Sequence, residues 1–190
     1  MSATASPNGL TPVYHPSGLD RASAYTITAA YSSSIFKGDP VILNANGTIT
    51  VGAAASALLG VFAGCEYIDA TGKPTYSNYW PASQSTQTGS VITAWVYTDP
   101  DIVYEIQGVS ALTIAAIGDE ADISTYAAGS TATGLSIVSL ATGTLAGAGS
   151  QKQFRIIGAG LAPDNAITDT YPVLRVTLAN TQFRVPTTAI

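Results

Sequence analysis

Few residues in this chain can act as a nucleophile, a base or a metal ligand. The 190 residues include one histidine, His15, and one cysteine, Cys65. A Ser-His-Asp arrangement would have to use His15, which stands in the proline-flanked segment TPVYHPSG, where we expect no rigid scaffold. Cys65 lies within GVFAGCEY, where a small buried side chain is its ordinary role. One Cys and one His cannot complete a structural zinc site. We therefore predict a non-enzymatic protein with no catalytic residue, no cofactor and no metal.

The acidic residues occur in small groups that we interpret as solvated turn carboxylates. None of the groups has the spacing of an EF-hand loop, so calcium is not predicted. A glycosidase pair stays formally open, because the sequence gives no separation between carboxylates. The groups are Asp99, Asp101 and Glu105 in TDPDIVYE, Asp119, Glu120 and Asp122 in GDEADI, and Asp164 with Asp169.

Composition and charge limit the partners of the chain. Its net charge is −5 with seven Lys and Arg in total, so there is no basic stripe for nucleic acid. No apolar run approaches the roughly 18 to 20 residues of a membrane span, and the start MSATASPNGL lacks the features of a signal peptide, so we expect synthesis in a cytoplasm. Charged residues make up only 10% of the chain, against a usual figure of about 25%. Such a surface suits an assembly, where part of it is covered.

The elements that must position these residues are predicted to be strands. Short β-rich runs alternate with turn signals, and no sustained helical period intervenes, although Ala53–Leu59 and Ala115–Ala128 can hold a turn or two of helix. Asn46-Gly47 predicts a tight hairpin with positive φ at both central positions. We therefore predict an all-β fold, a single antiparallel β-barrel or a jelly-roll-like sandwich. The expected strands are 25–31, 40–43, 48–51, 59–67, 90–97, 102–107, 112–114, 136–140, 154–158 and 173–178.

The first 24 residues are predicted to be an extended N-terminal arm, followed by a β-barrel or sandwich domain over residues 25–190. The arm contains Pro7, Pro12 and Pro16 and shows no periodicity. We expect its deletion to leave the domain folded. Its predicted contact residues are Leu10, Val13, Tyr14 and His15.

A polar loop over residues 69–89 contains Tyr76, Tyr79 and Trp80. Aromatic side chains on a long loop are often contact residues, so we predict these three to contact a partner. The alternative is that Trp80 caps one end of the core.

Several segments occur in an order that is typical of one group of viral proteins. The stretch IFKGDPVILNANGTITVGAAASALLGVFAGCEY combines a Gly-Asp-x-Val strand start, a hairpin and a Gly-Val-Phe-x-Gly strand, and Trp80-Pro81, WVYTDPDIVYEIQ, IGDEADI, TGLSIVSL and VLRVTLAN follow. Over residues 35–180 this order resembles bacteriophage capsid decoration (cement) and virion structural proteins. The resemblance implies a homo-oligomer, a trimer or dimer, that binds the major capsid protein on the capsid surface of the virion and stabilises the phage head. It implies no catalytic residues.

Three other functions stay open. A tail fibre or spike module that binds a receptor or glycan would use the aromatic loop for stacking. A bacterial surface-layer or pilus-like subunit would require export, for which the start shows no signal. A hydrolase lacks an identifiable base.

Overall fold

The computed structural model describes residues 4–124 and 128–184 and confirms the predicted all-β fold with a barrel. Within those ranges the helical content is one 3₁₀ turn, η1 (Ile114–Ala116). The strands are β1 (Thr11–Tyr14), β2 (Ala22–Ile27), β3 (Ile35–Phe36), β4 (Pro40–Leu43), β5 (Thr48–Val51), β6 (Gly60–Ile68), β7 (Pro74–Ser77), β8 (Tyr79–Trp80), β9 (Thr93–Tyr97), β10 (Val103–Gln107), β11 (Glu120–Ala121), β12 (Gly129–Ser130), β13 (Leu135–Ser136), β14 (Phe154–Ala159) and β15 (Val173–Leu178).

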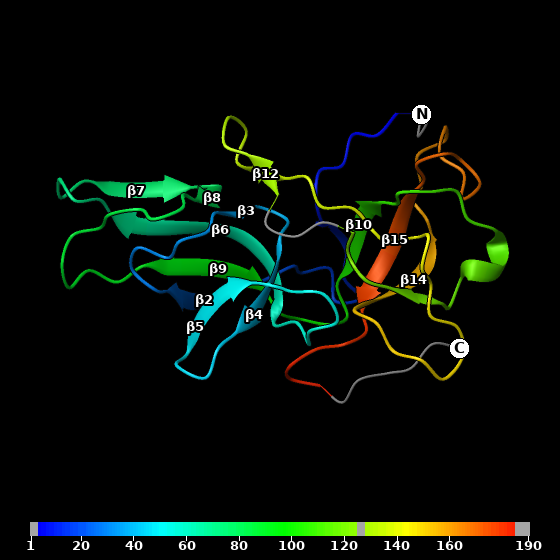
Figure 1. The fold of residues 1–190 in the computed structure, drawn as a ribbon, viewed down its shortest axis with the longest axis horizontal. Helices are drawn as coiled ribbons and strands as arrows, with labels where there is room; N and C mark the ends of the chain where they lie inside the picture. The colour runs from blue at the N-terminus through cyan, green and yellow to red at the C-terminus, as the bar shows by residue number, and fades with distance from the viewer. Residues whose placement is uncertain (1–3, 125–127, 185–190) are drawn as a thin grey trace.

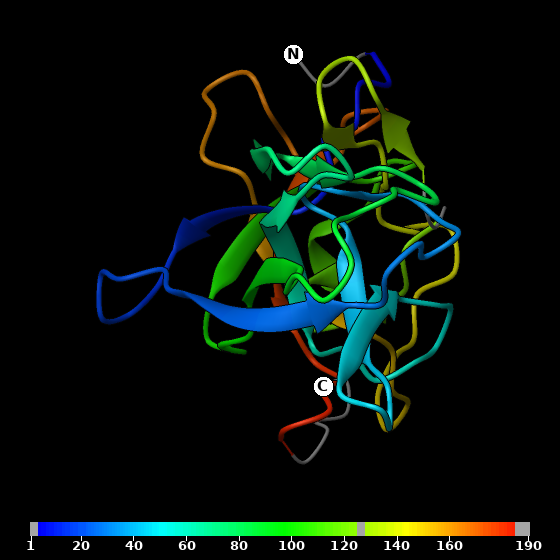
Figure 2. The ribbon, with the colours of Figure 1, turned by 90° about the vertical axis from the view of Figure 1, so that its left-hand side faces the viewer.

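Five strands close into a small barrel. β4 pairs with β5, β5 with β2, β2 with β9, β9 with β6, and β6 returns to β4. The pair β2–β5 is parallel and the other four pairs are antiparallel. β7 continues the sheet outward from the far end of β6. Figure 2 views the molecule from the end that carries β7. Closure of the barrel satisfies backbone groups that an open sheet would leave at its edges.

The second sheet has the antiparallel order β1-β10-β15-β14-β11 and lies beside the barrel along the long axis (Figure 1). Along β15, Leu174, Val176 and Leu178 are buried while the residues between them are half-buried, as the sequence alternation predicted. Each half has its own hydrophobic core. Leu58 and Val61 belong to the core of the second sheet although they lie before and within barrel strand β6, so the two halves pack together.

The N-terminal segment is extended, but it is part of the folded sheet rather than an arm apart from it. Thr11 pairs with Glu105 in β10, and β2 already begins at Ala22 in the barrel. Pro12 is tolerated because β1 is an edge strand. The predicted boundary at residue 24 is therefore wrong. Residues 1–3 of the predicted arm and 185–190 of the predicted domain lie outside the described residues.

The predicted hairpin joins β4 to β5, with one difference in its turn. Only Gly47 has a positive φ, of 80°, and its N–H donates to the carbonyl of Asn44 at 2.9 Å. The side-chain Oδ1 of Asn46 accepts the N–H of Thr48 at 3.1 Å. The loop 44–47 therefore has two residues more than the predicted turn, both of them before Asn46, and positive φ at Asn46 is not needed.

Candidate functional site

The structure separates the four predicted contact residues of the N-terminal segment. Leu10 is 2% exposed and packs in the core of the second sheet, so its prediction as an interface residue is wrong. Its N–H donates to the carbonyl of Gly38 at 3.0 Å, which fixes the segment against the β3–β4 corner. Val13 and Tyr14 are exposed on edge strand β1. These two stay predicted contacts.

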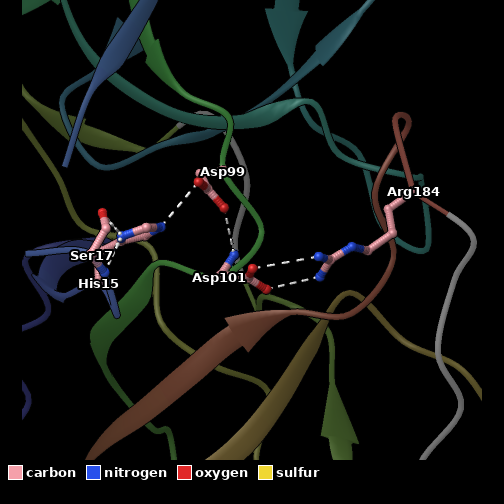
Figure 3. A network of polar contacts seen from close by, with 5 residues as sticks. All are labelled: His15, Ser17, Asp99, Asp101 and Arg184. Atoms are coloured by element: carbon pink, nitrogen blue, oxygen red, sulfur yellow. Dashed lines mark hydrogen bonds and ion pairs between the residues drawn. The ribbon is translucent and has the colours of Figure 1, made fainter. Parts of the chain in front are cut away.

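His15 lies in a network of polar contacts within its own chain (Figure 3). Its Nε2 is 3.0 Å from Oδ2 of Asp99, and its Nδ1 is 2.6 Å from Oγ of Ser17. Asp99 also accepts the N–H of Asp101, whose carboxylate pairs with Arg184 at 2.9 Å. The network therefore ties the turn after β1 to the β9–β10 loop and to the segment after β15.

Ser17, His15 and Asp99 form the sequence of contacts that a serine nucleophile requires. The hydrogen bonds around Ser17 differ from those of a catalytic serine. The N–H of Ser17 donates to Nδ1 of His15 at 3.0 Å, so it is engaged where an oxyanion donor is needed. The geometry favours a local turn that orients His15 towards Asp99.

The three aromatic residues predicted on the loop 69–89 lie in different environments. Tyr76 on β7 is 78% exposed. Tyr79 is half-buried and stacks on Phe36 with a centroid distance of 5.4 Å. Trp80 is fully buried and meets Tyr67 edge-on, so its prediction as a contact residue is wrong and the alternative, a core residue, is confirmed. Both strands β7 and β8 lie within what was predicted as a loop.

Trp95 on β9 is the aromatic contact candidate that the sequence reasoning missed. It is 38% exposed and lies opposite Gly64 of β6. Its neighbours Ala94 and Val96 are fully buried, so Trp95 points to the outer face of the strand. Residues 94–97 are all apolar, so the sequence carries no signal that distinguishes the two faces. Trp95, Tyr76, Tyr79 and the turn 131–134 surround a hollow of about 480 Å³.

The interpretation of the acidic groups as solvated turns is wrong for Glu120. This side chain is fully buried and pairs with Arg155 at 3.0 Å. It also accepts the backbone N–H of Lys152 at 2.7 Å, so its charge is compensated by partners on the β14 side. Asp122 pairs with the side chain of Lys152 at 3.3 Å. These carboxylates brace β11 and the segment before β14.

Asp39 is a second polar residue whose role the sequence did not indicate. Its fully buried carboxylate accepts the hydroxyl of Ser136 at 2.6 Å and the N–H of Phe36 at 2.8 Å. Burial raises its pKa to about 6, and the two hydrogen bonds oppose that rise. Asp39 therefore joins the β3–β4 corner to β13, and its protonation changes near neutral pH.

Cys65 is a small buried residue, as predicted. It is 3% exposed and its thiol donates to the carbonyl of Tyr79 at 3.4 Å. Burial raises the pKa of the thiol to about 12, so at neutral pH it is not a thiolate nucleophile.

Exposed apolar side chains occur on both halves of the molecule. Around the second sheet, Ile114 is 77%, Ile117 45% and Ile157 42% exposed. The N–H of Gly118 donates to the carbonyl of Ile156, which holds η1 beside β14. We call Ile114, Ile117 and Ile157 the sheet-end surface. In Figure 1, η1 and β7 lie at opposite ends of the long axis.

Within the described part of the chain, no group of three His, Cys, Asp or Glu side chains is placed to hold a metal ion. No described helix is long and apolar enough to cross a membrane. No protein-family model matches the chain, and no curated protein and no solved structure is significantly similar to it.

Proposed function

We propose that this chain is a non-enzymatic virion structural protein, a capsid decoration protein that binds the outer surface of the major capsid protein lattice and stabilises the phage head. The order of its strand and turn segments resembles such proteins. The observation that supports the role most directly is the sheet-end surface, an exposed apolar area on a chain with few charges.

The energetics of the sheet-end surface suit a lattice. Full burial of a large aliphatic side chain contributes about 1.5 to 3 kcal/mol. Three partly exposed isoleucines therefore give a modest affinity at one position, because docking also costs entropy. Repetition over the lattice, and pairing of copies into a dimer or trimer, raises the effective concentration without a tighter single contact.

Strand β1 offers a second means of contact on the same half of the molecule. It is an edge strand, and Tyr14 on it is 53% exposed. An edge strand can add to the sheet of a neighbour through main-chain hydrogen bonds. Pro12 limits that pairing to part of the strand. The sheet-end surface and edge strand β1 both belong to the half of the molecule formed by the second sheet. We therefore propose that this half faces the capsid and that the barrel end faces outward.

Binding to particles assembled without this protein tests the proposal. We expect Ile114→Ser combined with Ile117→Ser to lower occupancy at least tenfold, which corresponds to about 1.4 kcal/mol per site. Val91→Ser is the matched control, because Val91 is 71% exposed at the barrel end. We expect its occupancy to equal that of the wild type. Full occupancy of the double variant would contradict the assignment of the surface, and failure of the wild-type protein to bind would contradict the function.

The second candidate function is a tail fibre or spike module that binds a glycan. The hollow beside Trp95 favours it, since aromatic and uncharged polar side chains meet there. Localisation on the particle separates this candidate from the first.

A further inference from the structure

We propose that the hollow beside Trp95 is a binding site for a neutral oligosaccharide of at least two pyranose rings. The proposal rests on the second candidate function, glycan binding at this hollow, and names its ligand. It is independent of the capsid role, because the hollow lies at the barrel end rather than on the sheet half. The hollow measures about 480 Å³ and lies between β7, Trp95 and the turn 131–134. That volume is within the range of small-ligand sites.

The aromatic wall of the hollow is accessible because of the glycine opposite it. Gly64 faces Trp95 across the β6–β9 pair, at a register shift, with a φ of 150°. A Cβ at Gly64 would lie 3.0 Å from the carbonyl oxygen of Ser77, so this position favours glycine. The floor beside the indole is therefore backbone without a side chain. An exposed aromatic face of this kind can stack against the C–H face of a sugar ring.

The polar side chains of the hollow are uncharged. No Asp, Glu, Lys or Arg is among the described residues that line it. Asn78 and Thr131 are exposed, and neither side chain hydrogen-bonds to another described residue. Their amide and hydroxyl groups can exchange hydrogen bonds with sugar hydroxyls at little desolvation cost. A phosphate, a sulfate or an acidic peptide would find no cation here, so the lining selects a neutral ligand.

The rim of the hollow is held in place before any ligand binds. The N–H of Gly134 donates to the carbonyl of Ser130 at 2.7 Å, and the carbonyl of Gly134 accepts the N–H of Lys37 at 3.0 Å. A Cβ at Gly134 would lie 2.9 Å from Cβ of Asn78, so the turn packs closely on the β7–β8 connection. Figure 1 shows the β12 hairpin above β8. A preformed rim lowers the entropy cost of binding.

The length of the ligand follows from a second hollow. This hollow measures about 320 Å³, and Tyr76 lines both. Because the Tyr76 side chain is 78% exposed, it can contact two consecutive rings. Glu66 and Ser90 line the second hollow, and their side-chain oxygens can accept hydrogen bonds from hydroxyls of the second ring, while the Ser90 hydroxyl itself donates to the carbonyl of Gln87 at 2.7 Å.

Isothermal titration of the full-length protein with maltotriose, cellotriose, chitotriose and mannotriose tests the site. We expect at least one of these trisaccharides to bind, and Trp95→Ala to weaken its affinity at least tenfold. Tyr76→Ala, at a mostly exposed side chain, should weaken it as well and keeps the test valid if Trp95→Ala misfolds. Leu161→Ala is the control, because Leu161 is 77% exposed in the β14–β15 connection. Its affinity should equal that of the wild type.

Tryptophan fluorescence gives an independent measurement of the same site. The chain has two tryptophans, and Trp80 is fully buried. A sugar-dependent change in emission should therefore come from Trp95 and vanish in Trp95→Ala. The inference is overturned if no trisaccharide binds at about 10 mM, a concentration that detects Kd values in the millimolar range. It is also overturned if both aromatic variants bind as tightly as the wild type. Occupancy on capsids is measured separately, so failure here leaves the capsid proposal standing.

Discussion

Single residues in this chain matter mainly through burial. Trp80 and Trp95 are both aromatic residues beside β-rich segments, yet one is fully buried and the other is exposed beside a hollow. Sequence composition drew attention to Trp80 because it stands in a polar stretch, whereas Trp95 lies in an apolar run in which the sequence does not distinguish the exposed face. The role of Asp39 could not be read from its neighbours in the sequence either, because its hydrogen-bond partner Ser136 is 97 residues away.

Substitution Gly47→Val tests the turn between β4 and β5. Gly47 has a φ of 80°, and a Cβ there would meet no atom within 4 Å, so only the backbone conformation resists the change. We expect the variant to lose about 1 to 2 kcal/mol of unfolding free energy. Thermal unfolding measures it, with Ala45→Val in the same loop as the control. An unchanged melting temperature for Gly47→Val would show that the turn is assigned wrongly.

Substitution Asp39→Asn tests the buried carboxyl. The folded-state pKa of about 6 exceeds the ordinary value of 3.8. The stability contributed by the protonated carboxyl is therefore fully present below about pH 4 and is lost as the pH rises through 6. Across that window the wild type should lose up to about 3 kcal/mol relative to Asp39→Asn. Urea unfolding at pH 4, 5, 6 and 7 gives this difference, and a difference independent of pH would refute the assignment.

Substitutions His15→Ala and Ser17→Ala test the polar network of Figure 3. Because the Ser17 amide is engaged with Nδ1, we expect esterase activity at background in the wild type and in both variants. His15→Ala should lower the unfolding free energy by about 1 kcal/mol through loss of the contact with Asp99. Labelling of wild-type Ser17 by a fluorophosphonate probe, absent in His15→Ala, would contradict a structural role.

At the scale of elements, the sequence predicted those strands that have a clear alternation of side chains or a turn signal beside them, and it did not predict the very short strands. Strands β4, β5 and β15 occupy the residues that alternation and turn signals predicted. The predicted strand at 112–114 is absent, and η1 begins at Ile114. The two-residue strands β3, β8 and β11 were missed because their pairing depends on distant segments, such as Ile35 with Trp80. Strands β12 and β13 pair with each other in a short hairpin, and the predicted strand 136–140 shares only Ser136 with β13. Residues 125–127 of the predicted helical stretch lie outside the described residues.

Deletion of residues 2–20 tests whether the N-terminal segment is part of the sheet. The deletion removes β1 and Leu10, so the second core loses a buried side chain and β10 loses its edge partner. We expect a loss of at least about 3 kcal/mol, the order of a large apolar truncation with its cavity. Deletion of residues 2–5 keeps both features and should leave the urea midpoint nearly unchanged. If the longer deletion unfolded at the wild-type midpoint, the segment would be a dispensable arm.

At the scale of the whole molecule, the two proposed functions, capsid binding and oligosaccharide binding, are assigned to different halves. The second sheet carries the sheet-end surface and edge strand β1, whereas the barrel end carries the hollow beside Trp95. Leu58 and Val61, before and within barrel strand β6, pack in the core of the second sheet and so join the two halves. Under the proposed function, one end docks on the capsid and the other faces outward. An asymmetry of this kind follows from long-range packing and is not visible in the order of the segments.

Localisation on the particle tests the central claim most directly. Cryo-electron microscopy of particles with and without this protein gives a difference map. We expect added density on the outer surface of the head, repeated with the capsid lattice, with the η1 end against the major capsid protein and the β7 end outward. Density confined to the tail tip, or no density on the head, would contradict the capsid decoration role.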